Sequence, residues 1–273
     1  MRHMRYSPAL RTSAALVLSG IALVGCGELN RLEDYFATTA AEVLFLGISD
    51  PETLSALEEL GVTEGPMGIR AAATAFLAQA TSLESVAANL VDDADRVLVH
   101  NGSQGVNLDS QGNGLYFITS QDDPVLDYVP GTTYTFQAVK EGRSHTVSML
   151  APGVPALSGI PGGSDTHPPG QSLTVYLGGQ FDNAIVLVLD GDGNITHDNR
   201  PSTASEYVDW IQDESMQSSV TIPGEAFPEA GSLYIIGIAG IREALDSSYE
   251  NLNPLVSKLA MGSVAVQGVL TGL

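Results

Sequence analysis

The stretch Ile185-Val-Leu-Val-Leu-Asp-Gly-Asp-Gly-Asn194 sets the fold that we expect for the second half of the chain. Its first five residues are all apolar and three are β-branched, which is typical of a buried strand. The Asp-Gly-Asp-Gly-Asn run that follows contains the residues that best tolerate the positive φ of a tight turn. The stretch therefore predicts a β-hairpin with arms at 184–190 and 193–197.

Further strands are predicted on both sides of this hairpin. Short runs rich in Val, Ile, Thr and Tyr, separated by Gly, Pro, Asn and Asp, favour strands at 172–177, 217–222, 232–239 and 263–270. This spacing of strands and turns is typical of an antiparallel β-sandwich. We expect residues 171–273 to form one such domain.

Four segments of this region carry a resemblance to a known fold: Gln171-Ser-Leu-Thr-Val-Tyr-Leu177, the 185–194 hairpin, Val220-Thr-Ile-Pro-Gly224 and Gly231-Ser-Leu-Tyr-Ile-Ile-Gly-Ile238. Together they resemble the immunoglobulin-like sandwiches found widely in exported bacterial proteins. The region departs from antibody-type domains because it has no cysteine pair, and because Trp210 falls outside a clear strand. The resemblance implies two packed antiparallel sheets, and a fold of this kind does not by itself imply a ligand.

The preceding residues divide into two parts. Residues 96–150 are β-rich, with strands predicted at 96–100, 114–119, 132–139 and 144–150, and they suggest a partial sandwich of the same kind. Residues 151–170 contain five prolines and five glycines, which predicts a linker or a long irregular loop.

Residues 26–95 predict a helical segment. Apolar residues between Leu29 and Leu46 recur near helical spacing, and Ser49-Asp-Pro-Glu52 supplies a cap with a proline at the first helical position. An alanine-rich stretch over 69–80 and a second start at Ser82 extend the pattern. The predicted fold class is therefore α+β, with an N-terminal helical segment followed by a mainly antiparallel, immunoglobulin-like sandwich.

The first 25 residues predict a secretion signal. Residues 1–11 carry three arginines and no acid, and an apolar run of a dozen residues follows, which is shorter than the roughly 20 residues of a transmembrane helix. The run ends in Leu23-Val-Gly-Cys26, which resembles the lipobox of bacterial lipoproteins. The resemblance implies cleavage between Gly25 and Cys26, a diacylglycerol on the Cys26 thiol, and acylation of the new amino terminus (palmitate or a similar chain). Gly27, where an Asp would favour the inner membrane, makes the outer membrane the expected location.

The charge and the cysteine content exclude several classes of protein. The net charge is −21, and loss of the arginine-bearing signal makes the mature chain more acidic still. Such a chain repels nucleic acid, so we expect no nucleic-acid partner. Cys26 is the only cysteine, so the mature chain has neither a disulfide nor a free thiol nucleophile once that thiol carries a diacylglycerol.

Two sets of residues are candidates for a binding site. Asp190, Asp192 and Asn194 alternate as in calcium loops, and Asp198 lies close enough in sequence to add a ligand. The EF-hand pattern fails because its sixth and twelfth positions hold Ile195 and Pro201, so a simple hairpin turn is the alternative reading. The second set is Tyr207 and Trp210, which form a possible binding rim or pack on the core.

Catalytic motifs are weak in this sequence. Asn101-Gly-Ser103-Gln-Gly105 lacks the first glycine of a nucleophile elbow, and the histidines have no metal-ligand spacing. We therefore expect a membrane-anchored envelope lipoprotein that is not an enzyme, with no cofactor and with an envelope protein or glycan as partner. An envelope hydrolase acting on glycans and a calcium-stabilised adhesion module remain the alternatives.

Overall fold

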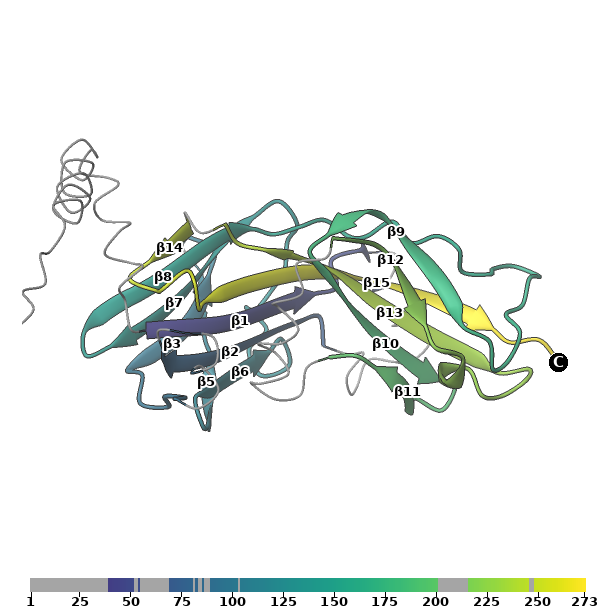
Figure 1. Cartoon of the computed structure of the whole chain (residues 1–273), viewed down its shortest axis with the longest axis horizontal. Helices are drawn as coiled ribbons and strands as arrows, with labels where there is room; N and C mark the ends of the chain where they lie inside the picture. The colour runs from purple at the N-terminus through teal and green to yellow at the C-terminus, as the bar shows by residue number, and fades with distance from the viewer. Residues whose placement is uncertain are drawn as a thin grey trace, which may run out of the picture.

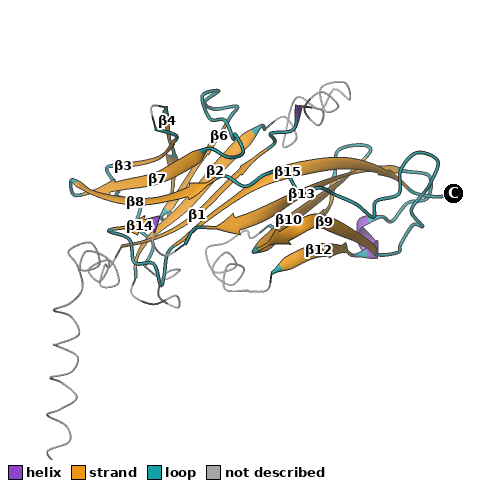
Figure 2. Cartoon of the chain, turned by 90° about the horizontal axis from the view of Figure 1, so that it is seen from above, coloured by secondary structure: helices purple, strands orange, loops and turns teal. Residues whose placement is uncertain are grey.

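The computed structural model describes residues 39–51, 54, 69–80, 82, 85, 89–102, 104–200, 216–245 and 248–273. Within these ranges the chain is almost entirely β (Figures 1 and 2). The strands of the first half are β1 (Thr39–Gly47), β2 (Ala71–Gln79), β3 (Arg96–His100), β4 (Gly105–Asn107), β5 (Asp109–Gly112), β6 (Leu115–Thr119), β7 (Thr133–Lys140) and β8 (Arg143–Leu150). Those of the second half are β9 (Leu173–Phe181), β10 (Asn183–Asp190), β11 (Ile195–Asp198), β12 (Gln217–Ile222), β13 (Leu233–Glu243), β14 (Tyr249–Glu250) and β15 (Lys258–Leu270).

These strands form three sheets. The largest has eight strands in the order β11-β10-β13-β15-β1-β2-β6-β5. A five-stranded sheet, β14-β8-β7-β3-β4, covers one end of it, and a two-stranded sheet, β12-β9, covers the other. Of the pairings between these strands, only that of β1 with β15 is parallel. The molecule is thus two sandwiches that share one continuous sheet.

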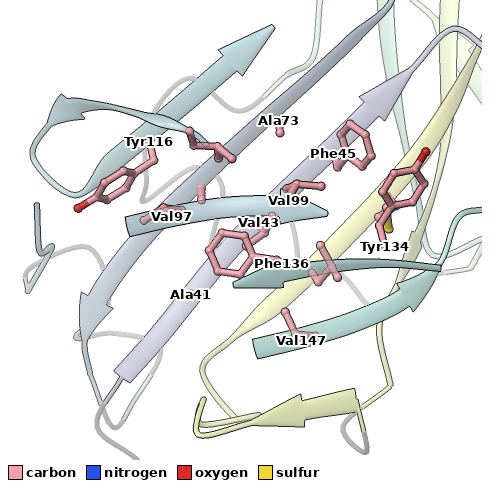
Figure 3. Packing of buried hydrophobic residues seen from close by; sticks show 14 of the residues in the cluster. Ala41, Val43, Phe45, Ala73, Val97, Val99, Tyr116, Tyr134, Phe136 and Val147 are labelled. Atoms are coloured by element: carbon pink, nitrogen blue, oxygen red, sulfur yellow. The ribbon is translucent and has the colours of Figure 1, made fainter. Parts of the chain in front are cut away.

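The first sandwich is complete and begins at β1. The large sheet contributes β1-β2-β6-β5, and the facing sheet contributes β8-β7-β3-β4 with β14 at its edge. β4 extends the facing sheet at its edge. When the other strands are counted in chain order without it, the first, second, fifth and fourth face the third, sixth and seventh, which is the Greek-key arrangement of immunoglobulin-type sandwiches. Figure 3 shows its core, in which Phe45 of β1 packs against Tyr134 of β7 with ring centroids 5.0 Å apart.

The helical segment expected over 26–95 is therefore wrong for the two strands that the structure describes there. Residues 39–47 form β1, and the alanine-rich residues 71–79 form β2, paired with β1 along its whole length. β1 lies in the middle of the large sheet, and most of its residues are apolar on both faces. Its apolar residues therefore run almost without a break, as in a helical pattern. In β2 the pairing with two neighbours overrides the helix propensity of alanine.

The helix starts that we expected near Pro51 and Ser82 are only partly within the described residues. Pro51 and Leu54 are helical, and the Leu54 backbone N–H donates to the Asp50 carbonyl at 3.0 Å. Ser85 is also helical. The described part of the chain contains no helix that is both long and apolar enough to cross a membrane.

The second sandwich is antiparallel and immunoglobulin-like, as predicted for this part of the chain. Of residues 171–273, however, Tyr249, Leu252, Leu259 and Met261 pack in the core of the first sandwich. β10, β11, β13 and the C-terminal part of β15 face β9 and β12, and the predicted hairpin is β10–β11. The core between the two sheets contains Leu177, Phe227 and Ile236, all fully buried. Residues 151–170 lie outside the named strands, but Leu157 and Ile160 pack against this core.

Each sandwich carries a tyrosine at the second residue of its central strand that bonds to the chain just before it. The Tyr134 hydroxyl donates to the Asp127 carbonyl at 2.8 Å and accepts from the Val129 N–H at 2.9 Å. The Tyr234 hydroxyl accepts from the Glu229 N–H at 3.0 Å. This tyrosine corner is a hallmark of immunoglobulin-type folds. It shows that the two sandwiches are a structural repeat, of which the sequence suggested only a partial sandwich over residues 96–150.

We expect Tyr134→Phe to destabilise the protein by about 1–3 kcal/mol, because it leaves a backbone N–H and a carbonyl of a partly buried corner without their partner. Urea unfolding of the full chain measures the change. Tyr176→Phe is the control, since Tyr176 is 55% exposed. Equal stabilities of the two variants would contradict a structural role for the corner.

Candidate functional site

A cleft of about 460 Å³ lies on the outer face of the eight-stranded sheet, the face turned away from the two smaller sheets. Its volume falls within the range of small-molecule sites. The lining comes from seven strands of the sheet and the adjoining segments, and consists of Leu44, Leu46, Gly47, Ile48, Ile69, Arg70, Ala71, Ala72, Thr74, Phe76, Leu115, Phe117, Ile185, Leu187, Asp198, Arg200, Gly237, Ala239, Val264 and Val266. We call this the sheet-face cleft.

Alternation along the strands explains how the cleft is placed. Successive side chains of a strand point to opposite faces, so Val43 and Phe45 of β1 enter the core of the first sandwich while Leu44 and Leu46 enter the cleft. An antiparallel sheet that faces water normally has polar residues on that side. An apolar outer face at the centre of this sheet is therefore a feature that needs an occupant or a cover.

Small residues shape the hollow. Gly237 and Ala239 of β13 and Ala72 of β2 are among the lining residues, and Gly237 has the larger Leu187 and Val266 as its register partners on the neighbouring strands. A Cβ built at Gly237 would lie 3.7 Å from Val264 and 3.9 Å from the Leu187 carbonyl, which is ordinary contact. Neither the backbone conformation nor close packing requires a glycine at position 237. The absence of a side chain there leaves space in the cleft.

Arg70, Thr74, Asp198 and Arg200 are the polar side chains among the cleft residues named above. Arg200 and Asp198 form an ion pair in which Nη2 donates to Oδ2 at 2.6 Å and Nε to Oδ1 at 2.9 Å. This bonding lowers the pKa of Asp198, against the opposing effect of burial, and raises the pKa of Arg200. The pair therefore stays charged and holds the guanidinium in a fixed orientation.

Glu42 lies two residues before Leu44 on the same face of β1. Its side chain is only 1% exposed, and neither carboxylate oxygen has a hydrogen-bond partner in the described structure. Burial raises its pKa well above the usual 4.5, Lys258 acts in the opposite direction, and Glu243 reinforces the rise. The Lys258 ammonium donates to the Glu243 carboxylate at 2.8 Å, so its positive charge is not available to Glu42 alone.

The four candidate calcium ligands lie on the β10–β11 hairpin. The Asp190 carboxylate accepts from the backbone N–H of Asp192 and from both the backbone and the side chain of Asn194, at 2.8–3.0 Å. Asp198 is held by Arg200 at the other end of β11. Within the residues that the structure describes, no group of three or more His, Cys, Asp or Glu side chains is arranged to hold a metal ion. The hydrogen bonds of the Asp190 carboxylate are those of a hairpin turn stabilised by its own side chains.

Several other predicted site residues fall outside the described residues. These are Gly25, Cys26, Ser103, Tyr207 and Trp210.

Sequence reasoning did not bring together Arg70 and Arg200, which are 130 positions apart and precede β2 and follow β11 respectively. The scarcity of basic residues could have pointed to these two arginines, because each arginine of so acidic a chain is a candidate for a specific contact.

Comparisons with known proteins give distant similarities of structure alone. No protein-family model matches the chain, and no curated protein is significantly similar to it in sequence. Among solved structures it is similar to domains from titin (9% identity, TM-score 0.19, 74% of this chain and 59% of that one). It is also similar to fibronectin(III)-like modules of Clostridium thermocellum CbhA (10%, TM-score 0.19, 70% and 84%) and to the central fibronectin-III array of RIM-binding protein (14%, TM-score 0.18, 72% and 64%). At TM-scores this low, the assignment of two immunoglobulin-type sandwiches rests on the strand order and the tyrosine corners of the chain itself.

Proposed function

We propose that the protein is a lipid-anchored, non-catalytic binding protein of the bacterial cell envelope, and that the sheet-face cleft is its binding site. The observation that carries the location is Leu23-Val-Gly-Cys26 at the end of a short apolar run. Acylation at Cys26 would add two or three chains, and two suffice for stable anchoring at about 0.8 kcal/mol per buried methylene. The expected location is the outer membrane.

Two features of the cleft support binding rather than catalysis. Its floor is apolar, with a few polar groups near it, which is the usual composition of a small-molecule site. Among the lining residues Asp198 is the acid, and its carboxylate is held by Arg200 at 2.6 Å. A carboxylate kept ionised by an arginine is a poor proton donor, so the described lining does not supply the acid–base pair of a hydrolase.

The experiment that tests the location is substitution of Cys26 with serine. We expect the wild-type chain to begin at an acylated Cys26, as seen in the mass of its N-terminal peptide, and to fractionate with membranes. Cys26→Ser should carry no acyl mass and should leave the acylated membrane pool. Gly27→Ala is the matched control, because it retains the thiol. An unacylated Cys26 in the wild-type protein would contradict the proposal.

A further inference from the structure

We propose that β1 and β15 form a clamp that resists force, so that the protein keeps its fold when tension is applied between its N-terminal side and its C-terminus. The clamp consists of β1 and the residues of β15 that pair with it, Lys258–Ser263. This inference goes beyond the binding role proposed above. It takes from that role only the source of the tension, since an acylated Cys26 would hold the chain a short distance before β1 begins at Thr39.

The two strands of the clamp run in the same direction. Their pairing is parallel, with six register pairs that begin at Glu42 and Lys258. The chain enters β1 at Thr39 from the N-terminal side, and it leaves β15 at Leu270 toward the C-terminus. Figure 1 shows β1 in the first sandwich and the C-terminus at the far end of the second. Tension between the two ends of the chain therefore pulls β1 and β15 in opposite directions along their own axes.

Such a pull loads the pairing in shear. The hydrogen bonds of a parallel pair are evenly spaced along the strands, so a pull along the strand axes strains all of them together. When two strands are instead separated from one end, the bonds break one after another. The rate of forced unfolding is set by the height of the unfolding barrier. A pairing loaded in shear therefore withstands more force than the same pairing opened from one end.

The neighbouring strands support the clamp on both sides. β1 and β15 lie in the interior of the eight-stranded sheet, in the order β13-β15-β1-β2. β1 has nine register pairs with β2, and β15 has eleven with β13. Tension that draws out either strand has to shear two pairings at once. By contrast β11, at the edge of the same sheet, pairs with β10 over three register pairs.

Side-chain packing opposes the sliding of β1. Val43 and Phe45 are fully buried in the core of the first sandwich. A shift of one residue would turn these side chains to the outer face, so the smallest shift that keeps them inside is two residues. A shift of two residues toward the N-terminus would bring Ser49 to the place of Gly47. A Cβ at that place would overlap Cβ and Cγ of Tyr128, which lie too close to the backbone to move aside easily.

The force would pass between the two sandwiches without a linker. β15 is a single strand of 13 residues, with Leu259 and Met261 in the first core and Val269 in the second. Tension that enters at β1 crosses to β15 and leaves along that strand. The two smaller sheets, which face the large one, therefore lie outside the path of the force.

Single-molecule force spectroscopy on the full chain tests the proposal. The chain is made in a cell-free system without membranes, so Cys26 keeps its thiol and, as the only cysteine, provides one attachment point. Leu273→Cys provides the second point for the shear pull, and Leu255→Cys provides it for the opening pull; both leucines are exposed. Leu255 lies beside the start of β1, because the Asn253 N–H donates to the Thr39 carbonyl at 3.0 Å. We expect the shear pull to need at least about twice the force of the opening pull at equal pulling speed.

Two valine variants, measured in the shear pull, separate resistance to force from overall stability. Val43 of β1 and Val147 of β8 are both fully buried in the same core, and only Val43 belongs to the clamp. Val43→Ala and Val147→Ala should both lower stability to urea, because each leaves a space in the core. At constant force Val43→Ala should unfold at least about tenfold faster than the parent, whereas Val147→Ala should change the rate by about twofold or less, because its packing is still intact when β1 begins to slide.

Equal forces in the two pulling directions would overturn the proposal, as would an equal rise of the unfolding rate in the two valine variants. Failure of Cys26 acylation in the cell is a separate result. It concerns the source of the tension, whereas the force measurement uses no membrane and reports the response of the strands themselves.

Discussion

Replacement of Gly262 by valine is expected to destabilise both sandwiches together. Gly262 lies on β15 where that strand pairs with β1 on one side and β13 on the other, opposite Leu46 and Ile241. A Cβ at this position would lie 2.5 Å from the Ile241 side chain and 2.9 Å from the Gly240 carbonyl, which is backbone and cannot move aside. We expect a loss of about 3 kcal/mol or more, the upper end of the range for overpacking.

The shared strand is the reason that both sandwiches should respond. Leu259 and Met261 of β15 belong to the core of the first sandwich, and Val269 belongs to that of the second. Urea unfolding of the full chain, followed by circular dichroism and by tyrosine fluorescence, should give one coincident transition shifted to lower urea. Gly162→Ala is the control, since a Cβ there meets nothing within 4 Å. Two separate transitions, with only one of them shifted, would contradict a shared cooperative unit.

Replacement of Glu42 by methionine is expected to stabilise the protein at neutral pH. The carboxyl group is fully buried without a hydrogen-bond partner in the described structure, and its pKa is raised chiefly by loss of hydration. Methionine has a similar shape and needs no partner. Removal of an uncompensated buried polar group of this kind gives about 1–3 kcal/mol.

The pH dependence has a definite sign. The folded protein holds a proton on Glu42 at pH values where the unfolded chain has released it, because the pKa of this group is higher in the folded state. The stabilising contribution is therefore full below about pH 4.5, the usual value, and is lost as the pH rises through the folded pKa.

Urea unfolding between about pH 5 and about pH 8 should show a decline for the wild type that is absent in both Glu42→Met and Glu42→Gln. Glu225→Gln, at an exposed site, should keep the wild-type profile. An unchanged profile in Glu42→Gln would show that Glu42 is hydrated in the folded protein.

The strands of the second sandwich could be predicted because their signals are local. In β10 and β11 a β-branched apolar run, a turn that needs positive φ and a second run occur within a few residues. Gly193 does adopt a φ of 83° in that turn. The strands β3, β6, β7 and β8 were predicted for the same reason.

β1 and β2 could not be recognised as strands because the decisive interactions are distant in sequence. β1 is held by β15, more than 200 residues away, in a parallel pairing that no local pattern announces. Apolar residues on both faces of β1 removed the polar alternation that would have marked it as a strand, and the alanines of β2 favour a helix when considered alone. The sheet-face cleft escaped notice for the same reason, since its lining exists only when seven strands lie side by side.

The sequence by itself determined the net acidic charge and the hairpins, and it predicts an export signal and a lipobox. The charge is a sum over residue types, and the other features depend on residues that are neighbours in the chain. Only the tertiary structure decided that two sandwiches share one sheet, that Glu42 is buried, and that Arg200 lies beside an apolar cleft. These features depend on which strands pair across long separations, and pairing is set by the packing of whole faces rather than by local preference.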